Sequence, residues 1–190
     1  VYDAAGPAGT EALVAPLADP DADVRRGSAL ALARRGDARI EVVEELARRV
    51  DEDWIENGRI ERLDVLLSLG PDALPAIRTL LRKGDPQLRP GLCAALVTLG
   101  EHAAPAMPEV LLLPDGIGML PAERTSSTSL FDKVIRAIGP AGVPALIEGL
   151  RSEDAATRGR AFAACRLLGP LAKDALPAVR EALTAKRIPG

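Results

Sequence analysis

The chain has few of the side chains that form reactive or metal-binding sites. Its 190 residues include one histidine and two cysteines, and aromatic residues make up 2% of the sequence. His102 and two cysteines far apart in the sequence match no known spacing of zinc ligands. We therefore expect no metal and no cofactor, and we interpret His102 as a polar residue at the start of a helix.

Charge and hydropathy argue against two further classes. Lysine and arginine number 24 against 27 aspartates and glutamates, which gives a net charge of −3. That balance is not typical of a nucleic-acid or membrane-surface protein, so a nucleic-acid partner is disfavoured. No apolar run approaches the roughly 20 residues of a membrane-spanning helix, and no signal peptide is visible. Because the chain starts without Met, we expect a processed product or a piece of a longer array. The compartment stays open, with the cytoplasm favoured.

Residues 69–100 contain a unit from which the fold can be predicted. It consists of two short amphipathic helices between two glycines. Gly70 follows an apolar run, as expected of a glycine in the left-handed conformation at a helix end, and Pro71 cannot continue that helix. Asp85 and Pro86 predict the N-cap and first residue of the second helix. Neither helix is long enough to be stable alone. The first helix has an apolar stripe formed by Ile77, Leu80 and Leu81.

The same unit recurs along the chain, with a closing glycine at intervals of about 30 to 39 residues. These closing glycines are Gly6, Gly36, Gly70, Gly100, Gly139 and Gly169. Four residues before each glycine from the second onward is a residue that we expect in the core, namely Leu32, Leu66, Leu96, Ile135 and Cys165. A period of this length with two helices per unit predicts an all-α protein. We expect an α-solenoid, a right-handed superhelix of antiparallel helix pairs with about five repeats and a terminal helix.

The repeat boundaries define one predicted domain that covers residues 1–190. We expect repeats at about 7–36, 37–70, 71–100, 101–139 and 140–169, followed by a half repeat at 170–190.

Three predicted second helices begin with Asp-x-x-x-Arg. The pairs are Asp21 with Arg25, Asp85 with Arg89, and Asp154 with Arg158, and Arg59 takes the arginine position of the second unit. With the Leu-Gly-Pro segment at 69–71 and the Ala-Leu-Pro-Ala segments at 73–76 and 175–178, they make the chain resemble the HEAT repeat family in its short bacterial form. The resemblance covers nearly the whole chain. It implies that the Asp residues cap helices and that the Arg residues tie neighbouring units together. We therefore expect structural roles for them and no enzymatic activity.

Two other patterns have a structural interpretation. Cys93 and Cys165 face the core in the repeat alignment and lie about 20 Å apart if helices stack at 8–10 Å. A disulfide needs Cα atoms within about 7 Å, so we expect two buried free thiols. The acidic segment 51–56 has Ile55 where a calcium loop needs its fifth-position oxygen ligand, which favours a solvated run of charge.

The outward face of the second helices is one candidate binding surface. We assign to it the positions nine, six and two residues before each closing glycine. This face is mixed in charge, has no aromatic residue and holds three cations that we regard as candidate binding residues, Arg34, Lys133 and Arg160.

Two insertions between paired helices form a second candidate. The first carries Trp54, and the second, at about 114–128, carries Ile117, Met119 and Leu120. Insertions in repeat proteins often mark the binding side, so the edge that carries both could hold a partner in a notch between them. The alternative is that Met119 and Leu120 fold back over the core of an irregular fourth unit.

The sequence favours a non-catalytic scaffold that binds another protein. Two alternatives stay open. One is an accessory subunit of a bilin lyase, which rests on the resemblance alone, and the other is a helical-repeat nucleic-acid binder.

Overall fold

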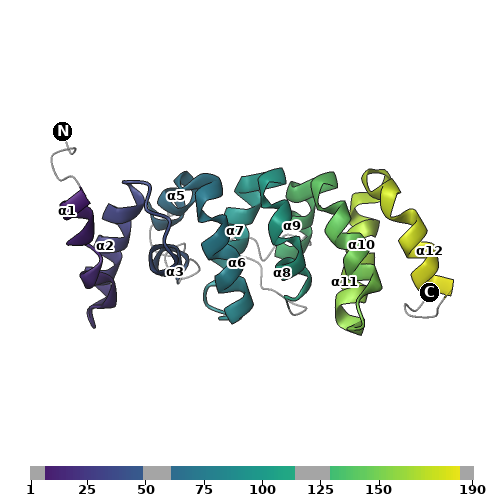
Figure 1. The fold of residues 1–190 in the computed structure, drawn as a ribbon, viewed down its shortest axis with the longest axis horizontal. Coiled ribbons are helices and arrows are strands. Elements are labelled where there is room, and N and C mark those ends of the chain that lie inside the picture. Colours follow the sequence, from purple (N-terminus) through teal and green to yellow (C-terminus); the bar gives the residue numbers. More distant parts are fainter. Residues whose placement is uncertain (1–6, 49–60, 114–128, 185–190) are drawn as a thin grey trace. The chain divides into compact units, whose positions relative to one another are not determined.

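The computed structural model describes residues 7–48, 61–113 and 129–184, and all the regular secondary structure in these ranges is helical (Figure 1). The prediction of an all-α protein is confirmed. The α-helices are α1 (Pro7–Glu11), α2 (Ala22–Ala33), α3 (Ile40–Ala47), α5 (Glu61–Ser68), α6 (Leu74–Lys83), α7 (Arg89–Leu99), α8 (Met107–Leu111), α9 (Leu130–Ile138), α10 (Val143–Arg151), α11 (Ala155–Leu168) and α12 (Leu176–Thr184). Short 3₁₀ helices join some of them, namely η1 (Ala15–Ala18), η2 (Gly70–Ala73), η3 (Gly100–Ala106), η5 (Gly139–Gly142) and η6 (Gly169–Ala175).

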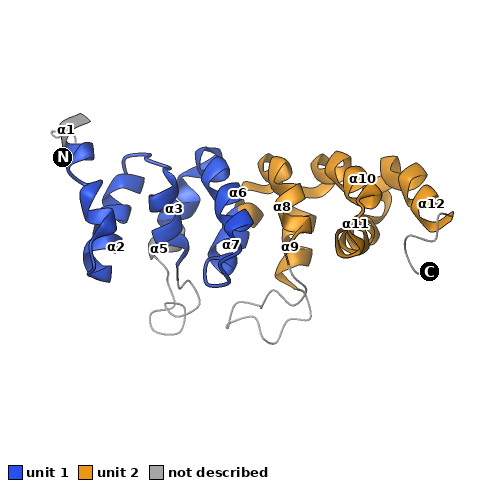
Figure 2. Cartoon of the chain, turned by 60° about the horizontal axis from the view of Figure 1, so that its bottom comes forward, with its two compact units in different colours: residues 1–95 blue, residues 96–190 orange. Residues whose placement is uncertain are grey.

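The helices form two compact units, Val1–Ala95 (unit 1) and Leu96–Gly190 (unit 2), and the division falls within α7 (Figure 2). Each unit contains helix pairs of the kind expected from the repeats. That the two units continue one right-handed solenoid as a single domain stays a prediction.

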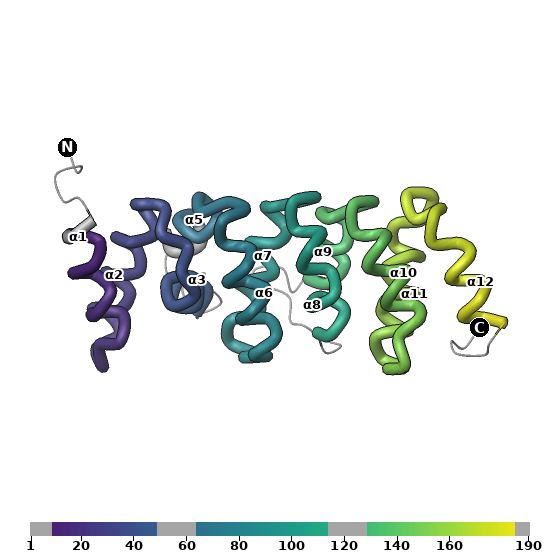
Figure 3. Tube along the Cα trace, viewed as in Figure 1, coloured from purple at the N-terminus to yellow at the C-terminus, as the bar shows by residue number. Residues whose placement is uncertain are grey.

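Unit 1 has two layers of helices. Helix α3 packs against α2, α5 and α6, and α2 packs against α5. The first helices α3 and α6 therefore form one layer, and the second helices α2 and α5 form the other (Figure 3).

Unit 2 repeats this arrangement. Helix α10 packs against α8, α11 and α12, and α9 packs against α11. The first helices are α8, α10 and α12, and the second helices are α9 and α11. Helices α10 and α11 pack together and are joined only by residues 152–154, so they run antiparallel.

The closing glycines have the positive φ that ends one helix and turns the chain toward the next. The angles are 79° at Gly36, 58° at Gly70, 57° at Gly100, 61° at Gly139 and 54° at Gly169. At Gly139 and Gly169, ψ is −146° and −123°. These two glycines are therefore not in the left-handed helical conformation, but in a region that is essentially reserved for glycine.

The connections after these glycines alternate in length. The 3₁₀ helices η2 and η5 have four residues each, whereas η3 and η6 have seven. In each case the following α-helix has a proline in its second position: Pro75 in α6, Pro108 in α8, Pro144 in α10 and Pro177 in α12. Such a proline fits there because its missing N–H would have no helical partner.

The predicted core positions are buried. The five residues four positions before a closing glycine are between 0% and 9% exposed. The stripe of α6 is also buried, with Ile77 at 0%, Leu80 at 1% and Leu81 at 5%. The repeat alignment therefore selects the core correctly.

Helix α7 begins later than the sequence predicts. Asp85 and Pro86 lie in a turn in which the N–H of Leu88 bonds the carbonyl of Asp85, and the helix starts at Arg89. The physical reason is Pro90, which has no N–H to donate to the carbonyl of Pro86, so a helix that began at Pro86 would lack a hydrogen bond in its first turn.

Unit 2 has a close crossing at a glycine of α10. A Cβ on Gly149 would lie 2.7 Å from Cδ1 of Leu111 and 2.9 Å from Cβ of Ala161, on α8 and α11 respectively. The absent side chain allows α10 to approach both neighbours. By contrast, a Cβ on the exposed Gly159 of α11 would meet nothing within 4 Å.

We therefore expect opposite effects from the same substitution at these glycines. Gly149→Ala should lower the free energy of unfolding by about 1–3 kcal/mol because it overpacks the crossing. The matched variant Gly159→Ala should raise it by about 0.5–1 kcal/mol, since alanine favours the helix more than glycine does. Urea unfolding followed by circular dichroism measures both. Equal effects would contradict the crossing.

Candidate functional site

The candidate residues of the two insertions lie outside the described residues. These are Trp54, Ile117, Met119 and Leu120, and Arg59 is outside as well. The site is therefore built from the remaining candidates and from the residues around them.

The three repeated aspartates act as caps or turn acceptors. Asp21 precedes α2 and accepts the N–H of Asp23 at 2.8 Å, and Asp85 accepts the N–H of Gln87 at 2.9 Å. Asp154 caps α11 and accepts the N–H of Thr157 at 2.7 Å. All three carboxylates are thus engaged by backbone N–H groups, two at helix starts and that of Asp85 in the turn before α7.

The repeated arginines bind the carbonyl groups of the turn that precedes their own helix. Nη1 of Arg25 donates to the carbonyls of residues 19 and 20 at 2.8 and 2.9 Å, and Nη1 of Arg158 donates to those of residues 152 and 153, both at 2.8 Å. Nη2 of Arg89 donates to the carbonyl of Gly84 at 2.7 Å. These bonds lie within one repeat, whereas the resemblance implied ties between repeats.

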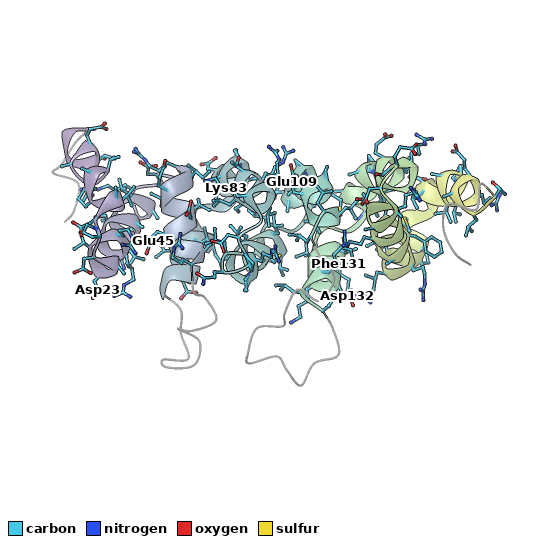
Figure 4. The ribbon with its side chains drawn as sticks, turned by 90° about the horizontal axis from the view of Figure 1, so that it is seen from below. Asp23, Glu45, Lys83, Glu109, Phe131 and Asp132 are labelled. Carbon is cyan, nitrogen blue, oxygen red and sulfur yellow. The ribbon has the colours of Figure 1, made fainter. Side chains whose placement is uncertain are left out.

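One of these arginines also reaches the next helix pair. Nε of Arg25 lies 3.5 Å from Oε2 of Glu45 on α3, and Nε of Arg48 lies 3.7 Å from the same oxygen. Arg48 also pairs with Glu44 at 2.8 Å, and Glu44 lies 3.7 Å from Nζ of Lys83. These ion pairs link α2, α3 and the end of α6 within unit 1 (Glu45 and Lys83 are labelled in Figure 4).

The turn after Gly36 is held by a side chain. The carboxylate of Asp37 accepts the backbone N–H of Arg39 at 3.1 Å and its Nε–H at 2.9 Å. The side-chain bond from Arg39 holds the pKa of Asp37 below its usual range. These hydrogen bonds between Asp37 and Arg39 lie just before α3, where the other described repeats have a 3₁₀ turn.

The three candidate cations differ in their surroundings. Arg34 is exposed at the end of α2, and Lys133 is half-buried on α9. Nη1 of Arg160 donates to the carbonyl of Leu111 at 3.0 Å, which ties α11 to α8. Arg160 thus links two helices of unit 2.

The predicted outward face needs a correction at its first position. Nine residues before the closing glycine, Gly27 is exposed, but Gly91 and Leu130 are buried. At about 100° per residue this position lies on the border between the buried and exposed sides of the helix. An apolar side chain there, such as Leu130, turns inward.

The exposed side of α9 and α11 instead includes the position three residues before the glycine. Arg136 and Arg166 occupy it, both exposed, and neither makes a hydrogen bond or ion pair with another described residue. Because α9 packs against α11, the equal register places the two guanidinium groups on neighbouring helices.

We call this surface the α9–α11 face. On α9 it consists of Asp132, Lys133 and Arg136, and on α11 of Phe162, Ala163 and Arg166. Figure 4 labels Asp132 in the first turn of α9, where its N–H bonds the Oγ of Ser129. Three cations, one carboxylate and one half-buried phenyl ring thus share the face.

Sequence reasoning missed Arg136 and Arg166 because it assigned the position two residues before the glycine to the outward face of every second helix. That position is exposed at the end of α2, α5 and α7 but half-buried in α9 and α11. A signal was present. Ile-Arg-Ala-Ile-Gly at 135–139 and Cys-Arg-Leu-Leu-Gly at 165–169 carry arginine at the same step. Only the exposure pattern distinguishes it from the neighbouring positions.

The thiols are free and buried, as expected. Burial raises the pKa of Cys93 to about 12, against the opposing charge of Arg89, and burial also raises the pKa of Cys165. Such thiols are not nucleophiles at neutral pH. Within the part of the chain that is described, no three metal-ligating side chains come together.

No family model, no curated protein and no solved structure matches this chain. Among the helices that the structure describes, none combines the length and the apolar character needed to span a membrane.

The turn bonds of Arg158 predict a loss of stability. Arg158→Ala should lower the free energy of unfolding by about 1–3 kcal/mol, because it removes charge-assisted bonds to two carbonyls in a half-buried turn. Arg166→Ala, on the exposed face of the same helix, should stay within about 0.5 kcal/mol of the parent. Chemical denaturation of both variants checks this. A large loss in Arg166→Ala would mean that the α9–α11 face is structural.

The cap of α11 predicts sensitivity to acid. The side chain and backbone N–H of Thr157 both donate to Asp154 and hold its pKa below the usual range. A depressed pKa in the folded state stabilises the protein above the unfolded value of about 3.9, and this contribution is lost as pH falls through the folded pKa. Between about pH 5 and 2, stability should fall less steeply in Asp154→Asn. Parallel pH profiles would contradict the cap.

Proposed function

We propose that the chain is a non-catalytic helical-repeat scaffold that binds another protein through the α9–α11 face. The observation that carries the proposal is the pair of exposed arginines at one register, Arg136 and Arg166, whose charges no described residue neutralises. A HEAT-like solenoid is part of the proposal, and what supports it is the same two-layer packing in each unit.

The non-catalytic part of the proposal rests on where the repeated charged residues are engaged. Asp21 and Asp154 accept backbone N–H groups at helix starts, and Asp85 accepts one in the turn before α7. The arginines that follow them donate to turn carbonyls. Groups bound in this way support the fold, and they are not positioned to exchange protons with a substrate.

The composition of the face favours a protein partner with acidic residues. Arginine and aromatic side chains are enriched where proteins meet. The α9–α11 face carries both kinds, because Phe162 belongs to it together with the cations. Arginine binds carboxylates in a planar, bidentate way. An acidic segment that also offers an apolar side chain for Phe162 would complement this surface.

The test uses a fluorescein-labelled acidic peptide of mixed glutamate, aspartate and leucine, with binding followed by fluorescence anisotropy. We expect the double variant Arg136→Glu with Arg166→Glu to bind about tenfold more weakly or worse, since each close charge pair is worth about 1 kcal/mol or more at low salt. Its melting temperature should match that of the parent protein.

The control changes the net charge by the same amount away from this face. Arg35→Glu with Lys173→Glu, both at exposed positions, should bind the peptide almost as well as the parent. If both double variants lost peptide affinity equally, binding would depend on net charge, and the proposed site would be wrong. Tighter binding of a single-stranded oligonucleotide of equal charge would instead support a nucleic-acid function.

A further inference from the structure

The first turn of α2 carries an exposed valine at a position that is buried in two other repeats. Val24, three residues after Asp21, is 40% exposed. The same position in the other two Asp-x-x-x-Arg segments is occupied by Leu88 and Thr157, which are 1% and 8% exposed. An apolar side chain at a position that otherwise belongs to the core thus remains on the surface.

Two carboxylates flank this valine. Residues 20–24 are all exposed, and at about 100° per residue Val24 lies between Asp21 and Asp23 on the surface of the helix (Asp23 is labelled in Figure 4). Oδ1 of Asp21 accepts the N–H of Asp23 at 2.8 Å, and its Oδ2 bonds no described residue. Asp23 forms an exposed ion pair with Arg26, of a kind that contributes little and can be exchanged. The turn thus presents carboxylate oxygens on both sides of an apolar side chain.

No other exposed apolar side chain in the described part of the chain has this setting. Only Val24 has, within three residues along the sequence, two carboxylates that the structure shows as exposed. The α9–α11 face is complementary to an acidic segment with an apolar side chain, so the first turn of α2 is a segment of this chain that fits it. The large apolar residues compared are Val24, Leu112, Leu171, Leu176 and Leu183.

We propose that the partner of the α9–α11 face is the first turn of α2 in a second copy of this chain, an inference that rests on the proposed function of that face. The carboxylates of the turn pair with Arg136 and Arg166, and Val24 contacts the half-buried ring of Phe162, one helical turn before Arg166. Arginine binds carboxylates in a planar, bidentate way. Both surfaces thus combine two charges of one sign with an apolar side chain, and the signs are opposite.

The spacing of the charges is also compatible with this pairing. Arg136 and Arg166 occupy the same register on two packed helices, and the axes of packed helices lie about 8–10 Å apart. Side chains on two sides of one helix are separated by a similar distance, because a helix with its side chains is about 10–12 Å wide. The end of α2 can therefore place Asp21 beside one arginine and Asp23 beside the other.

This contact joins two different surfaces, so it is heterologous. Each copy offers one α9–α11 face and one α2 turn, and further copies add until a ring closes or the series remains open. One helical turn buries less than the roughly 1,200 Å² of standard interfaces, and salt screens exposed ion pairs. Association should therefore occur at high protein concentration and low salt, and the monomer should return on dilution.

Two variants that each lack one of the surfaces test the pairing by sedimentation velocity at low salt. The face variant, Arg136→Glu with Arg166→Glu, keeps the α2 turn. The turn variant, Asp21→Ser with Asp23→Ser and Val24→Ser, keeps the face, and serine caps a helix about as well as aspartate does. Each variant alone should be monomeric at concentrations at which the parent associates. Their equimolar mixture should form a dimer and nothing larger, because the dimer uses the one intact turn and the one intact face. Recovery of association in the mixture also shows that both variants are folded.

The control Glu41→Ser with Asp72→Ser removes two exposed carboxylates elsewhere in unit 1 and should associate like the parent. A monomeric parent, association that persists in either variant, or a mixture that stays monomeric would overturn the pairing. If the labelled acidic peptide still binds through Arg136 and Arg166 in that case, the face has a different protein partner. If the peptide does not bind, the proposed function is wrong as well.

Discussion

The constraint on which the rest of the structure depends is the positive φ at the glycine that ends each described second helix. An L-residue at Gly139 or Gly169 would be strained, because φ near 60° with ψ beyond −120° is available in practice to glycine alone. That conformation ends one helix abruptly and directs the chain into a 3₁₀ turn. The next helix then packs on the layer of first helices. Short helices of eight to fourteen residues gain their stability from this packing, not from their own propensity.

The charged residues are divided between two tasks according to their place in the repeat. Cations at the start of a second helix, such as Arg25 and Arg158, donate to the carbonyls of the turn before that helix. Arg136 and Arg166 each lie three residues before a closing glycine. Both are exposed and bond no other described residue. An arginine thus supports the fold at one position of the repeat and is exposed at another. Its position in the repeat decides between these two roles.

The sequence predicted what local chemistry determines. A glycine after an apolar run has one good role at a helix end, and an apolar residue four positions earlier falls on the inner side, so Gly70 and Leu66 were identified correctly. The late start of α7 was missed because Asp85 with Pro86 has the sequence of a helix start, whereas Pro90, four residues later, has no N–H for the carbonyl of Pro86. The exposed arginines were missed because about 100° of rotation separates adjacent positions, and only packing against neighbours determines which arc stays exposed.

Charged side chains and close contacts both join the helices within the units. In unit 1, ion pairs join α2, α3 and α6, so cations such as Lys83 and Arg48 are engaged along their helix ends. In unit 2, α10 approaches α8 and α11 through the missing side chain of Gly149, a contact that uses no charge. Arg136 and Arg166, which are exposed on α9 and α11, take no part in the bonds between described helices.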